Sequence, residues 1–182
     1  MEGTMKKLLV ALSLIMISGC ASSNMIAPNK QPSLKPEPKK STLVIIRSFS
    51  AGSNVVFSHY MDGKFIGETK AKTYFVSQVP AGKHYLMGCA NNTATVQMDF
   101  IAGKIYYLCE GYAWPSNTTG FTPIQQEKAK EILRKCTYLE IDPESKVSDM
   151  NPKEYQRAVT DYNFEVKKNP EGFKDILDYK GQ

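Results

Sequence analysis

The chain has 182 residues, of which 42% are hydrophobic and 23% are charged, and its formal net charge is +5. These proportions are close to those of globular proteins and exclude a wholly disordered chain. The leader accounts for +1 of the charge (Lys6 and Lys7 against Glu2) and residues 21–42 for +3, so residues 43–182 carry only about +1. A body this close to neutral lacks the basic face of a nucleic-acid-binding protein, and we expect no nucleic-acid partner.

The first nineteen residues have the organisation of a secretory signal peptide. Lys6 and Lys7 form a short basic region, and residues 8–17 are uncharged and mostly apolar. This run is too short to span a bilayer, which needs about 20 apolar residues. Glu2 precedes the lysines, so Met5 is an alternative start of translation.

Residues 17–20 read Ile-Ser-Gly-Cys, which resembles the lipobox of bacterial lipoproteins. The resemblance implies cleavage between Gly19 and Cys20 and attachment of diacylglycerol to the Cys20 thiol. Two or three acyl chains hold a protein stably, since each buried methylene contributes ~0.8 kcal/mol. In similar lipoproteins, a residue such as Ala21 after the cysteine favours the outer membrane. We expect a lipid-anchored, periplasm-facing protein there; an ordinary signal peptide that ends near a cysteine is the alternative.

Residues 20–42 then join the lipidated cysteine to the body. This segment contains Pro28, Pro32, Pro36 and Pro38 and almost no apolar pattern. It cannot bury enough apolar surface to offset its ordering entropy, so the sequence predicts a disordered tether. Kept extended by proline, the tether would reach at most ~65–70 Å. Its lysines would either meet anionic head groups or stay in solvent.

Residues 43–142 consist of short strand-forming runs separated by turn signals. Residues 43–46 are apolar and mostly β-branched, as in a buried strand. Asp62-Gly63 supplies the positive φ angles of a type I′ hairpin turn. Further turns are expected at residues 80–82, 91–92 and 102–103. Closely spaced strands of this kind predict an antiparallel β-sandwich or a curled sheet.

Helix signals follow these strands. Thr122 and Pro123 read as the N-cap and first residue of a helix that precedes a last strand at residues 137–141. Asn151-Pro152 starts a second helix that ends near Lys168, and a last short helix begins after it. Their apolar stripes are expected to dock on the sheet, with a partner as the alternative. The expected fold class is therefore α+β and β-rich, with a helical C-terminal extension over residues 143–182.

The stretch from about Thr42 to Ile141 resembles a family of Gram-negative lipoproteins whose domain has no known function, and it is also similar to the PEGA-type surface β-domain. The matching segments are residues 43–47, 60–67, 79–84, 103–107 and 124–135. These segments are strands, turns and one helix rather than catalytic groups. The resemblance therefore implies a fold and a location but no reaction.

Catalytic and metal-binding patterns are not evident. The two histidines, His59 and His84, are both expected in strands without Cys-x-x-Cys or His-x-x-x-His spacing, so we expect neither a metal nor a cofactor. Phosphate-binding glycine loops and a Gly-x-Ser-x-Gly elbow are also missing from the sequence. Alternation along the strand places His84 and Cys89 on opposite faces, which argues against a Cys–His nucleophile.

Three cysteines beyond the lipidation site allow three disulfide pairings in the oxidising periplasm. If residues 91–92 and 102–103 are two-residue turns, Cys89 and Cys109 lie two strands apart, beyond the ~7 Å that a disulfide spans. We therefore predict that any bridge uses Cys136, with Cys109 as the preferred partner.

The same register divides the strand at residues 104–114 into two faces. Ile105, Tyr107 and Cys109 are expected in the core. The opposite face is expected to expose an aromatic strip beside a carboxylate, suited to stacking on a cell-wall glycan or to an envelope protein. The residues of this predicted partner-binding strip are Tyr106, Glu110, Tyr112 and Trp114. The alternative is that a helix covers it.

Together these patterns predict a membrane-anchored envelope lipoprotein that acts as a non-enzymatic binding or structural module. A small anchored enzyme acting on peptidoglycan or lipid, and a carrier of apolar ligands, are the alternatives. A deep cleft that brings a histidine against a carboxylate or a free thiol would favour the enzyme. The partner and the oligomeric state stay open.

Overall fold

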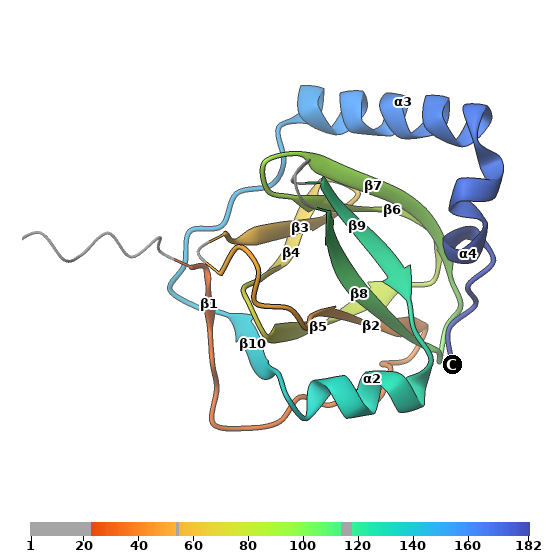
Figure 1. Cartoon of the computed structure of the whole chain (residues 1–182). Coiled ribbons are helices and arrows are strands. Elements are labelled where there is room, and N and C mark those ends of the chain that lie inside the picture. The colour runs from red at the N-terminus through yellow and green to blue at the C-terminus, as the bar shows by residue number, and fades with distance from the viewer. Residues whose placement is uncertain (1–22, 54, 114–117) are drawn as a thin grey trace, which may run out of the picture.

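The computed structural model describes residues 23–53, 55–113 and 118–182, which form two β-sheets and several helices (Figure 1). The strands are β1 (Met25–Ile26), β2 (Lys40–Arg47), β3 (Phe57–Met61), β4 (Lys64–Thr69), β5 (Thr73–Pro80), β6 (Gly82–Cys89), β7 (Thr93–Phe100), β8 (Ile105–Ala113), β9 (Thr118–Pro123) and β10 (Thr137–Ile141). The helices are α2 (Gln126–Leu133), α3 (Pro152–Lys168), the 3₁₀ helix η1 (Pro170–Phe173) and α4 (Lys174–Leu177).

The two sheets face each other as a sandwich. The larger sheet has the order β1-β10-β5-β2-β8-β9 and the smaller one the order β4-β3-β6-β7. Most neighbours are antiparallel, but β10 with β5 and β2 with β8 run parallel. In Figure 1, α2 lies below the larger sheet and α3 crosses above the smaller one. The β-rich α+β class, the helix before the last strand and the helical C-terminal extension are confirmed.

Two apolar cores hold these layers together. The main core lies between the sheets and includes the fully buried Leu43, Leu86 and Phe100. A second core lies under α2, where Val44 and Ile46 pack against Ala129. Since alternate residues of β2 point into different cores, this strand is apolar on both faces.

Two local signals are confirmed, the turn between β3 and β4 and the cap at the start of α3. Asp62 and Gly63 have φ angles of 51° and 81°, as a type I′ turn requires. Asn151 caps α3 by accepting a hydrogen bond from the Lys153 N–H at 2.9 Å. The predicted start of α2 is wrong, because Thr122 and Pro123 belong to β9 and the helix begins at Gln126.

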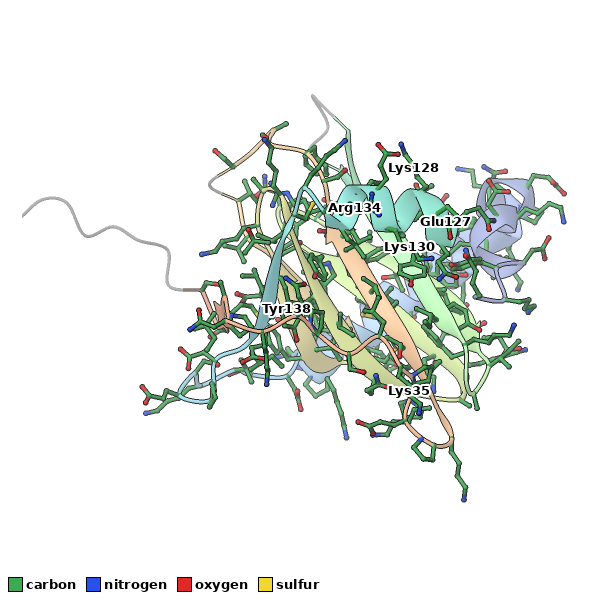
Figure 2. The ribbon with its side chains drawn as sticks, turned by 90° about the horizontal axis from the view of Figure 1, so that it is seen from below. Lys35, Glu127, Lys128, Lys130, Arg134 and Tyr138 are labelled. Carbon is green, nitrogen blue, oxygen red and sulfur yellow. The ribbon has the colours of Figure 1, made fainter. Side chains whose placement is uncertain are left out.

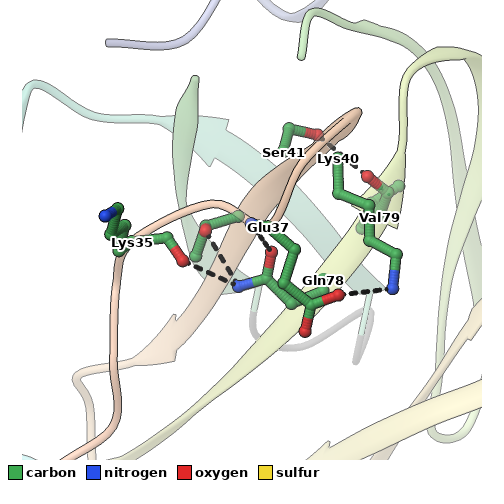
Figure 3. Close-up of polar contacts among 7 residues, drawn as sticks. Lys35, Glu37, Lys40, Ser41, Gln78 and Val79 are labelled. Carbon is green, nitrogen blue, oxygen red and sulfur yellow. Dashed lines mark hydrogen bonds and ion pairs between the residues drawn. The ribbon is translucent and has the colours of Figure 1, made fainter. Parts of the chain in front are cut away.

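Residues 23–42 are not a disordered tether in the structure. Met25 and Ile26 pair with β10, which makes β1 the edge of the larger sheet. Farther along, the Gln78 amide donates to the Lys35 carbonyl at 3.4 Å and accepts from the Glu37 N–H at 3.0 Å (Figure 3). The segment is ordered despite its composition because it pairs with a strand of the body and with side chains of the body. It therefore needs no core of its own.

A buried carboxylate fixes the start of this segment. Glu68, only 4% exposed, accepts hydrogen bonds from the backbone N–H of Asn24 at 3.0 Å and from its side-chain amide at 2.7 Å. It also accepts from the hydroxyls of Ser23 and Ser58, each at 3.3 Å. Residues 23 and 24 are therefore held against the hairpin of β3 and β4.

In the described part of the chain, no helix combines the length and the hydropathy needed to cross a bilayer.

Candidate functional site

A large groove opens between α3 and β9, and we call it the α3 groove. Its volume is about 1160 Å³, comparable to the larger clefts that bind ligands in proteins. One wall is α3, the other is β9, and the first half of β7 forms the floor. Phe173 of η1 and Ile176 of α4 close one end.

The wall formed by α3 is fixed at both ends. At its start, the Met150 N–H donates to the Gly63 carbonyl at 2.8 Å, and the Tyr155 ring lies over Gly63. At its end, the Tyr162 ring packs edge-on against Phe173 with the ring centroids 5.4 Å apart. The helix is thus tied to the β3–β4 turn and to the C-terminal extension, which sets the width of the groove.

The opposite wall carries an aromatic side chain that reaches toward the core. Phe121 of β9 lines the groove, and its ring centroid lies 6.0 Å from that of the buried His59. Gly88 of β6 leaves the room for this ring, because a Cβ at that position would stand 2.8 Å from the Phe121 Cζ. The apolar surface of this wall is therefore continuous with the interior of the sandwich.

Acidic side chains dominate the rim. Glu154, Asp161 and Glu165 follow one another along the face of α3 that lines the groove. Asp149 before α3 and Asp175 on α4 add two further carboxylates. The lining holds a single basic side chain, Arg157, whose Nε lies 3.7 Å from the Asp161 carboxylate. The described lining thus has a net charge of −4, on a chain whose overall charge is +5.

The thiol in the groove is not activated. Cys89 lies at the end of β6, with its Sγ 3.4 Å from the Thr93 hydroxyl. Burial raises its pKa, and this effect outweighs the lowering by the Thr93 hydrogen bond. A thiol with a raised pKa stays protonated at neutral pH and is a poor nucleophile. No histidine is among the described residues that line the groove.

The predicted aromatic strip on β8 is wrong for two of its four residues, Tyr106 and Glu110. Tyr106 is fully buried, where its hydroxyl donates to the Asp99 carbonyl at 3.0 Å and accepts from the Ile101 N–H at 2.9 Å. Glu110 is only 4% exposed. The side chain of Tyr112 and all of Trp114 lie outside the described residues.

The physical reason is that β7 and β8 do not form a hairpin. The turn at Gly103 carries the chain from the smaller sheet to the larger one, where β8 pairs with β2 and β9. Tyr106 then faces the main core and Tyr107 faces the core under α2, so both faces of the strand are buried. The predicted two-residue turn at residues 91–92 is wrong too, since Cys89 pairs with Thr93 and residues 90–92 lie between them.

Glu110 instead belongs to a buried polar cluster that spacing in the sequence does not reveal. One of its carboxylate oxygens lies 2.8 Å from His59 Nε2, and the other accepts a hydrogen bond from the Thr69 hydroxyl. His59 and Thr69 are fully buried. His59 and Glu110 are 51 residues apart in sequence, and no local signal joins them.

The second histidine also meets a carboxylate, at the β3–β4 turn. His84 Nδ1 lies 2.5 Å from an Asp62 oxygen, and the other oxygen accepts from the Tyr85 N–H at 2.9 Å. These contacts tie the turn to β6. In the described residues, no group of three or more His, Cys, Asp or Glu side chains could hold a metal ion.

The predicted disulfide is not formed, since Cys89, Cys109 and Cys136 are free thiols in the structure. Cys109 and Cys136 nevertheless pack against the same core under α2. Burial, followed by the nearby Cys136, raises the pKa of Cys109 to about 11. The predicted cleavage and lipidation residues, Gly19 and Cys20, lie outside the described residues.

Comparisons with protein-family models, with curated proteins and with solved structures found no match to this chain, so the family resemblance rests on the sequence motifs alone.

Proposed function

We propose that the protein is a lipid-anchored envelope lipoprotein whose body binds a partner through the α3 groove and catalyses no reaction. The observation that carries the proposal is the groove itself: a cleft of about 1160 Å³ with an apolar end, an aromatic wall and a charged rim. Clefts of this kind are the usual binding sites of proteins.

The placement of the titratable groups supports binding over catalysis. His59 and Glu110 form a pair, but with side-chain exposures of 0% and 1% they are closed to a substrate. His84 and Asp62 are more exposed, but neither lines the groove. The groove thiol of Cys89 has a raised pKa. A general base must come within hydrogen-bond reach of the proton it removes, and neither histidine meets that condition in the groove.

The ordered N-terminal segment changes the expected geometry at the membrane. Three peptide steps separate Cys20 from Ser23, and three residues span at most ~11 Å. A lipid on Cys20 would therefore hold the body close to the bilayer surface, instead of at the end of a long tether.

The charge distribution supports one orientation of the anchored body. Residues 126–135 carry four basic and two acidic side chains, and Lys35 lies on the same side of the molecule, as Figure 2 shows from below. That side is opposite α3 (Figure 1). Basic side chains near a bilayer gain roughly 1 kcal/mol each from anionic lipids. In this orientation α2 faces the lipid and the α3 groove faces the periplasm.

Lipidation is tested with a fatty-acid probe and by membrane fractionation of wild type and of Cys20→Ser. We expect the wild type to incorporate the probe and to sediment with outer membranes, and Cys20→Ser to do neither. Unlabelled wild type, or a variant that fractionates like it, contradicts the anchor.

Binding at the groove is tested by placing a photo-crosslinking amino acid at Arg157 in cells. The matched control is Gln156, which is equally exposed on α3 but lies outside the groove lining. We expect a discrete crosslinked product from position 157 and none from position 156. Equal crosslinking at both positions, or none at position 157, contradicts the proposal.

A further inference from the structure

We infer that the α3 groove takes an extended, positively charged segment of a protein partner; this inference rests on the binding function proposed above. The charge of the groove favours a basic ligand. Five carboxylates and one arginine line the described groove, and the body as a whole is close to neutral. Complementary charge steers a partner and fixes its register, so a segment rich in lysine or arginine fits this rim.

The spacing of two of these carboxylates suits an extended segment. Asp161 and Glu165 are four residues apart on α3, which corresponds to a rise of ~6 Å along the helix. Alternate residues of an extended strand are ~6.6–6.8 Å apart and point to the same side. Two basic residues separated by one position in an extended segment can therefore meet Asp161 and Glu165, whereas the residue between them faces the floor and β9.

The edges of two strands border the groove and suit an extended segment. β7 ends the smaller sheet and β9 ends the larger one, and both line the groove. An edge strand directs alternate N–H and C=O groups away from its sheet, where an extended segment can pair with them. Among the described residues no further strand pairs with either edge, and backbone groups beside an acidic rim favour a peptide over a small cation.

The apolar end gives the segment its remaining contacts. Phe173 and Ile176 close this end of the groove, and Phe121 adds an aromatic ring on the β9 wall. Aromatic and aliphatic side chains in a partly closed pocket are typical anchors of a binding site. The preferred segment therefore carries at least one apolar side chain among its basic residues. Phosphate-rich ligands such as nucleic acids do not fit, because the rim repels them.

The probe is a nine-residue peptide in which lysine alternates with valine or threonine, with one phenylalanine, and the full-length protein is titrated by calorimetry. The control peptide has glutamate in place of each lysine. We expect binding of the lysine peptide only, with a dissociation constant that rises several-fold between low and physiological salt as the charges are screened. Equal binding of the glutamate peptide, or spermidine binding as tightly as the lysine peptide, overturns the inference.

Variants on the exposed rim test the effect of charge on peptide binding without disturbing the folded core. Glu165→Lys and Glu154→Lys are each expected to weaken binding of the lysine peptide about threefold to fivefold, the upper part of the range of exposed charge pairs. The matched control is Glu171→Lys, an equal charge change on an exposed residue of η1 outside the lining. It should leave the affinity within about twofold. An effect of Glu171→Lys as large as that of Glu165→Lys overturns the inference.

One variant should act in the opposite direction. Arg157 is the single basic side chain of the described lining and partly neutralises Asp161. Arg157→Ala should tighten binding of the lysine peptide about twofold to threefold, whereas weaker binding contradicts the charge argument.

The two proposals fail in different ways. If the segment crosslinked at position 157 in cells carries no basic residues, the cationic ligand is wrong and the binding function stands. If the lysine peptide binds but no partner is crosslinked in cells, the groove chemistry stands and the cellular function proposed here is wrong.

Discussion

His59 of β3 and Glu110 of β8 join the two sheets of the sandwich through a contact of 2.8 Å in its interior. The ring centroid of Phe75 lies 5.2 Å from that of His59. The ring of Phe121 lies between His59 and the α3 groove, which it lines. A polar contact in such surroundings is sensitive to the loss of either partner, because the remaining group has no access to water.

Glu110→Ala should therefore lower the free energy of unfolding by about 2–5 kcal/mol, since it leaves His59 and the Thr69 hydroxyl without their partner and each unpaired buried group costs about 1–3 kcal/mol. Urea denaturation followed by circular dichroism measures the change. The exposed Glu144→Ala is the control and should stay within about 0.5 kcal/mol of the wild type. A loss below about 1 kcal/mol for Glu110→Ala would show that the pair does not hold the sheets together.

Gly88→Ala tests how closely the interior and the groove wall are packed. The added Cβ would stand 2.8 Å from the Phe121 Cζ, so the ring has to move toward the groove. We expect a loss of about 1–3 kcal/mol in the free energy of unfolding, as for other overpacked sites, together with weaker binding of the lysine peptide.

Gly120→Ala is the matched control for this change. It also lines the groove, but a Cβ there meets nothing within 4 Å. Its free energy of unfolding should stay within about 0.5 kcal/mol of the wild type. Similar losses for the two variants would refute the role of Phe121.

What could be predicted from the sequence depends on how local the cause is. The cap at Asn151 and the turn at Asp62-Gly63 follow from groups within two or three residues, and both are confirmed. The pairing of β8 is not local, because its partners β2 and β9 are chosen by the core as a whole. Tyr106 and Tyr107 carried a usable signal, since apolar residues at consecutive positions are typical of a strand buried on both faces.

The candidate site was the least predictable part. The spacing of Glu154, Asp161 and Glu165 marks one face of a helix in the sequence alone. Nothing in the sequence says that β9 lies opposite that face, because β9 reaches its place through the pairing of β8. The groove is thus a product of tertiary arrangement, and the residues that line it are far apart in sequence.

Glu68→Ala tests whether the N-terminal segment is held by the contacts seen here. The variant removes the acceptor for Ser23 and Asn24. A proline-rich segment without such partners is expected to be disordered. We expect faster proteolysis at the lysines of residues 30–40, by about tenfold or more if the released hydrogen bonds are worth more than 1.4 kcal/mol. Cleavage rates like those of the wild type would mean that β1 and the Gln78 contacts retain the segment without Glu68.

The Cys109 thiol provides a test that depends on pH. Its pKa is raised from 9.0 to about 11, first by burial and then by the neighbouring Cys136. Because only the thiolate is alkylated, the rate of Cys109 modification by iodoacetamide should rise about tenfold per pH unit from 8 to 10 in the folded protein. In urea the rate should level off near pH 9.

The raised pKa of Cys109 also makes the stability of the protein depend on pH. Folding disfavours the thiolate, so the folded-state pKa lies above the unfolded one, and the stability that this group contributes is fully present below pH 9. That contribution is lost as the pH rises from 9 through about 11, where the folded protein also has to ionise the thiol. A Cys109→Ala variant should therefore lose less stability over this range than the wild type. Parallel curves for the two proteins, or an alkylation rate in the folded state that levels off at pH 9, would show that the Cys109 thiol is open to water.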